Sequence, residues 1–289
     1  MHPRDRRHDA CSRARTAAFV VASATAMTPA AKRILVTGAS SGLGAALARK
    51  LAAPGVTLML CARRRGPLEQ IATELRACGA EVIAEPLDVS EIAPCSDWID
   101  RMWQQGPIDL AILNTGIFAG RSPDGRAETP QAAAEIITTN LIGAAAPALR
   151  LAERMRQRKA GQIVFISSLA AFGPLADAPS YSASKAGLTA FARALREDLL
   201  PEQVKVTIVH PGHVETRQTA QHVGPLPGMV SAERAADLIL RAILSARSEH
   251  AFPFHLHLSL RGLALLPLRW QYRLNKAFRF TVRPTDPLD

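Results

Sequence analysis

The chain has 289 residues, 48% of them hydrophobic, and a formal net charge of +10. This length fits one α/β domain with extensions, and the apolar fraction is enough for a large buried core. Residues 1–33 carry +5 and residues 250–289 carry +4, which leaves +1 for the region between them. A nearly neutral centre lacks the basic stripe with exposed aromatic residues that nucleic-acid binding needs, so we exclude nucleic acid as a partner.

The spacing of cysteine and histidine residues argues against disulfides and metal binding. The four cysteines have no C-x-x-C spacing, which predicts reduced thiols and a cytoplasmic location. The eight histidines include His210 with His213 and His255 with His257, but further ligands at compatible spacing are missing from the sequence. We predict no metal site.

Residues 1–31 are rich in Arg, Ala and Ser and have no apolar period, which predicts a disordered leader. A secretory signal also matches the basic start followed by TAAFVVASATA, although that apolar stretch is weak. A start of translation at Met27, six residues before the first expected strand, is a further alternative. We favour a disordered or spurious leader.

From Lys32 onward, runs of branched apolar residues alternate with helical patterns. The expected strands are 33–37, 56–60, 81–87, 108–113, 161–167 and 204–210. The expected helices are 43–53, 67–77, 91–105, 131–157, 181–200 and 231–247. This alternation predicts a parallel sheet covered by helices on both faces, and the doubly wound, Rossmann-like fold is the natural member of that class. We assign residues 32–250 to a single α/β domain of this type.

Residues 251–289 are predicted to be a basic, apolar C-terminal extension. Its cations keep every nearly uncharged run far below the ~20 residues that span a bilayer, and Pro267 should divide it into two short helices. Two alternatives stay open. The segment packs onto the domain or a partner subunit, or it lies on a membrane surface with Trp270 and Tyr272 at headgroup depth.

The first expected strand runs directly into TGASSGLG (37–44), which opens a helix. Glycines at these positions let the backbone turn tightly and approach a pyrophosphate, and the helix N-terminus offers free N–H groups. This pattern predicts a dinucleotide site whose contacts include Gly38, Ser40, Ser41, Gly42, Leu43 and Gly44.

The second expected strand ends at Arg63-Arg64-Arg65, where an NAD-preferring site usually has an acidic residue. Arginine matches the geometry of the 2′-phosphate of NADP, and Arg63 is the best candidate, assisted by Ser40 or Ser41. We therefore predict NADP(H) over NAD(H). The alternative is that these arginines are simply solvated at the start of a helix.

Tyr181 and Lys185 lie at positions i and i+4 of an expected helix, and Ser168 ends the preceding strand. Reduction of a carbonyl needs a proton donor to oxygen, and a nearby ammonium group favours the phenolate form of a tyrosine. Ser168 would stabilise charge on the substrate oxygen. A second Y-x-x-x-K, at Tyr272 and Lys276, has no core strand leading into it, so we give it no role.

Together these landmarks resemble the short-chain dehydrogenase/reductase family over about residues 33–250. The resemblance implies that Asp88 and Val89 lie near the adenine. It implies that Asn114 and Gly116 belong to an N-A-G-like element, in which Thr115 replaces the alanine. It also implies that Asn140 is the fourth catalytic residue and holds a water that relays protons toward Lys185. It also implies Pro211, Gly212, Val214 and Thr216 near the nicotinamide carboxamide. The family commonly forms homodimers or homotetramers, which implies contacts through helices 131–157 and 181–200.

The residues expected around the reacting carbon are Phe118, Leu169, Phe172, Leu175, His213 and the loop 217–230. This mostly apolar lining favours a lipophilic carbonyl or alcohol as the substrate of an NADP(H)-dependent oxidoreductase. Two alternatives remain open: a family member that acts on polar or sugar substrates, and a catalytically silent NADP-binding regulator.

Overall fold

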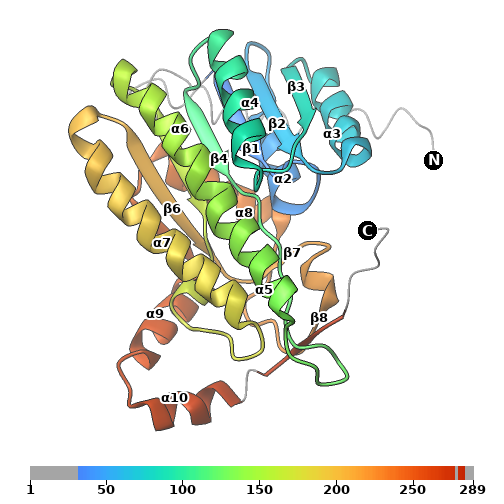
Figure 1. Cartoon of the computed structure of the whole chain (residues 1–289), viewed down its shortest axis with the longest axis vertical. Coiled ribbons are helices and arrows are strands. Elements are labelled where there is room, and N and C mark those ends of the chain that lie inside the picture. Colours follow the sequence, from blue (N-terminus) through green and yellow to red (C-terminus); the bar gives the residue numbers. More distant parts are fainter. Residues whose placement is uncertain (1–31, 277–278, 284–289) are drawn as a thin grey trace.

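The computed structural model describes residues 32–276 and 279–283. At its centre is a seven-stranded parallel sheet in the order β10-β6-β5-β4-β1-β2-β3, with helices on both faces (Figure 1). The strands are β1 (Arg33–Thr37), β2 (Thr57–Ala62), β3 (Glu81–Pro86), β4 (Leu110–Leu113), β5 (Gln162–Ile166), β6 (Lys205–Pro211) and β10 (Glu249–Phe252). The helices that cover them are α2 (Gly42–Leu51), α3 (Arg65–Ala77), α4 (Ile92–Gln104), α5 (Pro130–Ile137), α6 (Gly143–Arg158), α7 (Pro179–Leu199) and α8 (Ala232–Leu244). The predicted doubly wound α/β fold is confirmed.

The central strands are apolar on both sides because each side of the sheet is buried. In β1, Ile34 and Val36 join a core with α2, α3 and α8, whereas Leu35 joins a second core with α4, α6 and α7. All six residues of β2 are buried. This two-sided burial explains why the strands read as continuous apolar runs.

The segment predicted as one helix over 131–157 is divided in the structure. Thr129 caps α5 by accepting a hydrogen bond from the Ala132 backbone N–H at 3.2 Å, and a π-helical turn, η1 (Thr138–Ile142), separates α5 from α6. Within the described residues, the stretch 130–158 alone is long and apolar enough to cross a membrane by length and composition. Its Ala148, Leu151 and Met155 are buried in the core beneath α6, as in a core helix.

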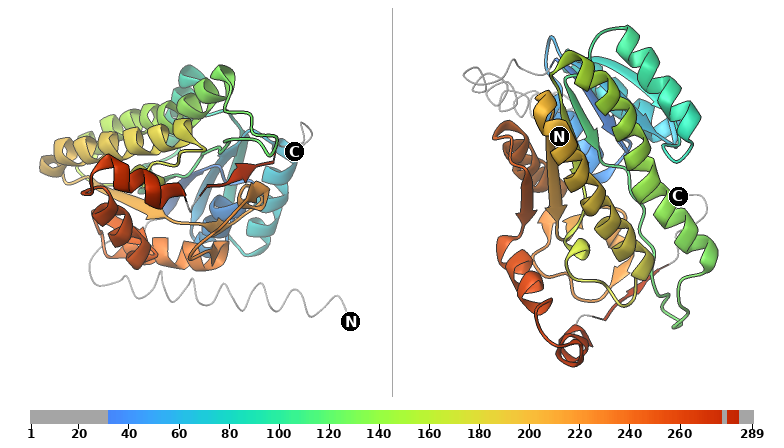
Figure 2. Two further views of the ribbon diagram at one scale, coloured as in Figure 1. Left: turned by 90° about the horizontal axis from the view of Figure 1, so that it is seen from below. Right: turned by 60° about the vertical axis from the view of Figure 1, so that its left-hand side comes forward.

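The C-terminal region is closely joined to the domain, as one of the two alternatives for residues 251–289 expects. The boundary expected after residue 250 falls inside β10, which pairs with β6 as a seventh, edge strand. Beyond it lie α9 (Phe254–Leu263) and α10 (Leu268–Asn275), and Pro267 stands between them as predicted. The chain then returns to the domain, where β11 (Thr281–Val282) pairs with β8 (His222–Val223) (Figure 2). The predicted leader, residues 1–31, lies outside the described residues.

Candidate active site

The glycine turn after β1 is held in a tight conformation. Gly38 and Gly42 have φ values of +66° and +53°, a region that favours glycine. A Cβ on Gly44 would lie 2.2 Å from the Gly38 carbonyl oxygen, so helix α2 can approach the turn this closely only without a side chain there. Asn114, after β4, donates its Nδ2 to the carbonyls of Thr37 and Gly38 at 3.1 and 3.3 Å, which fixes the turn against the neighbouring strand.

A cleft of about 610 Å³ opens beside this turn, at the carboxyl edge of β1 and β4. The strand order changes direction between these two strands, which is where doubly wound folds bind nucleotides. Seventeen of the nineteen residues predicted for the site line this cleft: Gly38, Ser40, Ser41, Gly42, Leu43, Arg63, Asp88, Val89, Asn114, Gly116, Ser168, Tyr181, Lys185, Pro211, Gly212, Val214 and Thr216.

The other two, Gly44 and Asn140, do not line the cleft. Gly44 instead permits the close packing of α2 on the turn. Asn140 is fully buried in the π turn, where its Oδ1 accepts from the Ile117 backbone N–H at 2.7 Å and its Nδ2 donates to the Ile117 carbonyl at 2.9 Å. Nδ2 also donates to Ser184 Oγ at 3.1 Å, so Asn140 joins the loop after β4 to helix α7.

The outer end of the cleft is basic. Arg63 and Arg64 both line it, and the Arg63 side chain is about half exposed. Arg63 also forms an ion pair of 3.6 Å with Glu135 of α5, which lines the same cleft. Sequence reasoning missed Glu135, because an acidic residue in a helix 72 positions away gives no local signal of this contact.

Ser168, Tyr181 and Lys185 meet at the inner end of the cleft. Burial raises the pKa of Tyr181, and a hydrogen bond from the Ser168 side chain opposes this shift. The Lys185 ammonium lies 5.9 Å from the centre of the Tyr181 ring and donates to the Ile166 carbonyl at 3.0 Å. Burial lowers the pKa of Lys185 to about 8. Ser168 is oriented by its oxygen, which accepts from the Ala170 backbone N–H at 3.2 Å.

Gly116 separates two polar groups of this centre. A Cβ on Gly116 would lie 3.3 Å from Lys185 Nζ and 3.4 Å from Asn140 Oδ1. Because glycine has only a hydrogen atom in place of a Cβ, a space remains beside Gly116 that both Lys185 Nζ and Asn140 Oδ1 border.

A second cavity, of about 260 Å³, adjoins the first. The two share Phe118, Ser168, Tyr181, Gly212, Gln218 and Thr219, so the hydroxyl groups of Ser168 and Tyr181 stand at their junction. Of the predicted substrate lining, Phe118, Leu169, Leu175, His213 and part of the loop 217–230 line this cavity. The prediction for Phe172 was wrong: its ring does not line the cavity and packs on His210 and His257, with centroid distances of 4.7 and 4.6 Å.

One wall of the second cavity comes from residues that sequence reasoning did not place in the site. They are Leu256, Leu260 and Leu263 of α9, together with Asn275, Arg279 and Phe280. The Phe280 ring stacks on His222 at a centroid distance of 4.4 Å and on Phe118 at 6.0 Å. Burial, followed by the charge of His222, lowers the pKa of His213 to about 4, so His213 is neutral at physiological pH.

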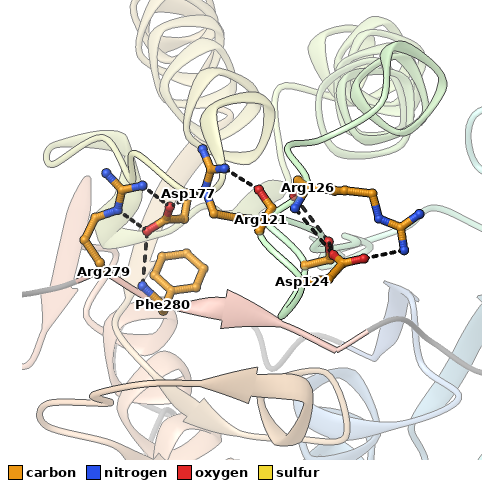
Figure 3. A network of polar contacts seen from close by, with 8 residues as sticks. Arg121, Asp124, Arg126, Asp177, Arg279 and Phe280 are labelled. Atoms are coloured by element: carbon orange, nitrogen blue, oxygen red, sulfur yellow. Dashed lines mark hydrogen bonds and ion pairs between the residues drawn. The ribbon is translucent and has the colours of Figure 1, made fainter.

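The returning C-terminal segment is anchored on Asp177 (Figure 3). The Asp177 carboxylate, 1% exposed, accepts from Arg279 Nε at 2.8 Å, from the Phe280 backbone N–H at 3.1 Å and from Arg121 Nε at 3.0 Å. Burial acts to raise the pKa of Asp177, but these hydrogen bonds and the arginine charges hold it below its ordinary value. Asp177 lies just before α7, so the same short segment positions both this anchor and Tyr181.

The residues of the first cleft fit a dinucleotide. The glycine turn leaves backbone N–H groups of the α2 N-terminus open, and the first turn of α2 contains no acidic residue that would repel a phosphate. The Thr115 hydroxyl also lines the cleft and is buried without a hydrogen-bond partner among the described residues. Within the same part of the chain, His, Cys, Asp and Glu side chains form no cluster of three placed to hold a metal.

Comparisons with known proteins agree with this geometry. The family model described as short chain dehydrogenase matches residues 32–224. An uncharacterized oxidoreductase of Myxococcus xanthus is 36% identical over 234 residues, which cover 81% of this chain and 92% of that protein. The ketoacyl reductase HetN of Nostoc is 34% identical over 228 residues, covering 75% and 77%.

Among solved structures, a short-chain dehydrogenase from Sphingobium yanoikuyae in complex with NADPH matches with a TM-score of 0.70 and 25% identity, covering 86% of this chain and 96% of that one. The glycine turn, the parallel sheet and the matched sequence thus lead to one assignment. The chain belongs to the short-chain dehydrogenase/reductase family and is an NAD(P)-binding oxidoreductase.

Proposed function

We propose that this protein is an NADP(H)-dependent reductase of lipophilic ketones or aldehydes, and that Tyr181 is its proton donor. The observation that carries the proposal is the junction of the two cavities, where Ser168 and Tyr181 line both a dinucleotide-sized cleft and a mostly apolar pocket. A carbonyl carbon held there faces the cleft while its oxygen faces two hydroxyl groups. When bound in the cleft, NADP(H) would supply the hydride for carbonyl reduction, or accept it in alcohol oxidation.

The proton chemistry of the chain favours reduction near neutral pH. Because burial raises the pKa of Tyr181, the phenol keeps its proton and can donate it to the carbonyl oxygen. Ser168 can donate a hydrogen bond to that oxygen, where negative charge develops. Lys185, whose pKa is lowered to about 8, is mostly protonated at pH 7, and its charge stabilises the phenolate that remains. The space beside Gly116 lets a water connect Lys185 with Asn140 and return the proton.

The preference for NADP(H) rests on the basic end of the cleft. Arg63 and Arg64 line it, and β2 ends without an acidic residue that would repel a 2′-phosphate. The Ser40 and Ser41 hydroxyl groups lie on the same cleft and can share that phosphate. The similar Sphingobium dehydrogenase was solved with NADPH, which supports the same assignment.

The apolar wall of the second cavity supports a lipophilic substrate. Its side chains include Phe118, Leu169, Leu175 and Phe280, and His213, which also lines it, is uncharged at neutral pH. The relative HetN is named as a ketoacyl reductase, which is also a reduction of a carbonyl. We further propose a cytoplasmic homodimer or homotetramer assembled through α5, η1, α6 and α7, where Ile142 of η1 and Leu149 of α6 are exposed.

The test uses the purified full chain with NADPH and a panel of carbonyl compounds. Turnover is measured as the decrease in NADPH absorbance. The panel contains aliphatic and polycyclic ketones, medium-chain aldehydes and, for comparison, sugar aldehydes of similar size. We expect turnover of the lipophilic compounds and a kcat/KM for NADPH well above that for NADH. NADPH binding without turnover of any compound would indicate a silent regulator, and a tenfold preference for NADH would contradict the cofactor assignment.

The matched control for the chemistry is Tyr181→Phe, which removes the proton and keeps the ring that packs edge-on against Phe118. Loss of general acid catalysis should lower kcat by about 10²- to 10⁴-fold. NADPH affinity, measured by fluorescence titration, should change little. A variant that retains wild-type kcat would exclude Tyr181 as the donor.

A further inference from the structure

Helices α9 and α10 follow one another beyond the carboxyl edge of the sheet, at the lower end of the molecule in Figure 1, and the two helices with the turn between them are called the hairpin. In this hairpin, residues 254–275, every residue is described and none is fully buried. A helix pair of a water-facing domain would be expected to present polar residues on its outer side. This hairpin instead presents exposed apolar residues mixed with exposed cationic ones such as Arg261 and Arg269.

Large apolar side chains gather on the hairpin. The described residues contain fifteen exposed ones, and eight of these fall within residues 254–274: Phe254, Leu258, Leu265, Leu266, Leu268, Trp270, Tyr272 and Leu274. Their exposed fractions reach 87% at Leu265 and 80% at Leu268. Single exposed apolar residues are normal on a protein surface, but eight large ones within 21 consecutive residues mark this segment as a candidate interaction site.

The opposite side of α9 is already used. Leu256, Leu260 and Leu263 line the apolar cavity, and Leu260 packs so closely on Gly173 that a Cβ there would lie 2.5 Å from it. Phe254 and Leu258, on the outer side, have no such role. Helix α9 therefore has one side on the apolar cavity and the other side exposed on the surface of the protein.

The charge of this segment identifies the kind of surface it fits. Its ionised groups are Arg261, Arg269 and Arg273, with Lys276 directly after it, and residues 254–276 contain no Asp or Glu. Two copies of such a basic face would repel each other, which argues against self-association through the hairpin. Apolar side chains mixed with Arg and Lys, with Trp and Tyr among them, are typical of helices that lie in the headgroup region of an anionic bilayer.

We propose that the α9–α10 hairpin docks the protein onto the surface of an anionic phospholipid membrane. The helices, of ten and eight residues, are too short to cross a bilayer and are suited to lie in its plane. Trp270, with Arg273 5.4 Å from its ring, would sit at headgroup depth. This docking is separate from the proposed function, because it needs neither Tyr181 nor a particular substrate.

The experiment is a co-sedimentation assay of the full chain with vesicles of pure phosphatidylcholine and with vesicles that contain 30% phosphatidylserine. Deletion of the tail is unsuitable, because β11 and Arg279 contribute to the domain. The variants are Leu268→Glu with Trp270→Glu, which removes apolar contacts, and Arg269→Glu with Arg273→Glu, which reverses charge. Ile92→Glu is the matched control, since Ile92 is an exposed apolar residue (55%) of α4 and lies outside the hairpin.

We expect the wild type to partition onto the phosphatidylserine vesicles and little onto the neutral ones, and 0.5 M NaCl should release most of it. Both hairpin variants should lower the partition coefficient at least tenfold, and Ile92→Glu should leave it unchanged, with NADPH binding retained in all of them. If a variant fails to bind NADPH, quenching of Trp270 fluorescence in the wild type by brominated lipid gives the same answer, with Trp270→Phe as its blank. Equal partitioning onto both vesicle types, no partitioning, or an equal effect of Ile92→Glu would overturn the proposal.

Discussion

Asp177 and Arg279 lie 102 positions apart in the chain, yet the guanidinium of Arg279 contacts both carboxylate oxygens of Asp177, at 2.7 and 2.8 Å. Asp177 precedes the helix that carries Tyr181, and Arg279 precedes Phe280, which lines the apolar cavity. This pairing therefore holds one wall of the substrate cavity against the segment that positions the proposed proton donor. Because the carboxylate is 1% exposed, the pair is shielded from solvent on its acidic side.

Arg279→Ala should loosen this wall without affecting the dinucleotide cleft. We expect KM for a lipophilic ketone to rise about tenfold, because hydrogen bonds to a charged partner are lost. The KM for NADPH should stay within a factor of two. Steady-state kinetics with each substrate varied in turn separates the two effects. Arg126→Ala is the control, since the ion pair of Arg126 is with the exposed Asp124 in the same loop network.

Asp177→Ala should be far more harmful than Arg279→Ala, because it leaves two arginines without their buried partner. We expect a loss of unfolding free energy of about 3 kcal/mol, measured by urea denaturation. The pKa of Asp177 is lower in the folded protein than in the unfolded chain, so its stabilisation is present above pH 4 and is lost as the pH falls further. If Asp177→Ala were as stable as Arg279→Ala, Asp177 would not be the anchor of the returning C-terminal segment.

Gly116→Ala should slow catalysis while the protein stays folded. The new methyl group would occupy the space between Lys185 Nζ and Asn140 Oδ1, where the proposed water connects them. We expect kcat to fall about tenfold or more, because small displacements of reacting groups are costly. Gly66→Ala is the matched control, as a Cβ at Gly66 meets nothing within 4 Å. An unchanged kcat would remove the proposed water connection.

Arg63→Ala should weaken the binding of NADPH and leave that of NADH nearly unchanged. Loss of charge-assisted hydrogen bonds to a phosphate should raise KM for NADPH about 10- to 100-fold. Glu135→Gln should act in the opposite direction, because it frees Arg63 from its 3.6 Å ion pair on the cleft. That pair is exposed, so the gain should be below about fivefold. Equal effects of Arg63→Ala on both cofactors would contradict the role of Arg63.

The buried Lys185 should make stability depend on pH. Its pKa is about 8 in the folded protein and near 10.4 in an unfolded chain, so the unfolded chain binds more protons between these values and stability rises with pH. Compared with Lys185→Met, the wild type should gain about 2 kcal/mol of unfolding free energy between pH 7 and pH 9.5. Urea denaturation at both pH values measures this. The same pH dependence of unfolding free energy in wild type and Lys185→Met would contradict the lowered pKa of Lys185.

Local patterns were sufficient to predict most of the fold and the cleft. The apolar runs of β1, β2 and β5 are buried on both sides, so their composition alone marks them as central strands. The glycine turn and the Tyr181–Lys185 spacing are contained within a few residues, and the structure places both on one cleft. The strand order then follows from the fold class.

The features that escaped prediction depend on distant contacts or on weak local signals. Strand β10 has the sequence EHAF, lies at the edge of the sheet and is mostly only partly buried, so it lacks the apolar run of a central strand. The break of the helix at Asn140 depends on hydrogen bonds to Ile117 in another segment. The wall formed by α9 and Phe280 depends on distant contacts that no spacing rule reveals, namely the packing of Leu260 on Gly173 and the Asp177–Arg279 pair.

The two cavities are lined in part by different regions of the sequence. The side chains that line the dinucleotide cleft all fall between residues 38 and 221, whereas the outer wall of the substrate cavity is supplied by residues 256–280, beyond the segment that the family model matches. Under the proposed function, substitutions at the cavity-lining residues of this segment would change which substrate is bound without altering the dinucleotide cleft. Substitutions in this C-terminal segment are therefore a route by which substrate specificity could change, in evolution or by engineering, while the cofactor cleft is kept.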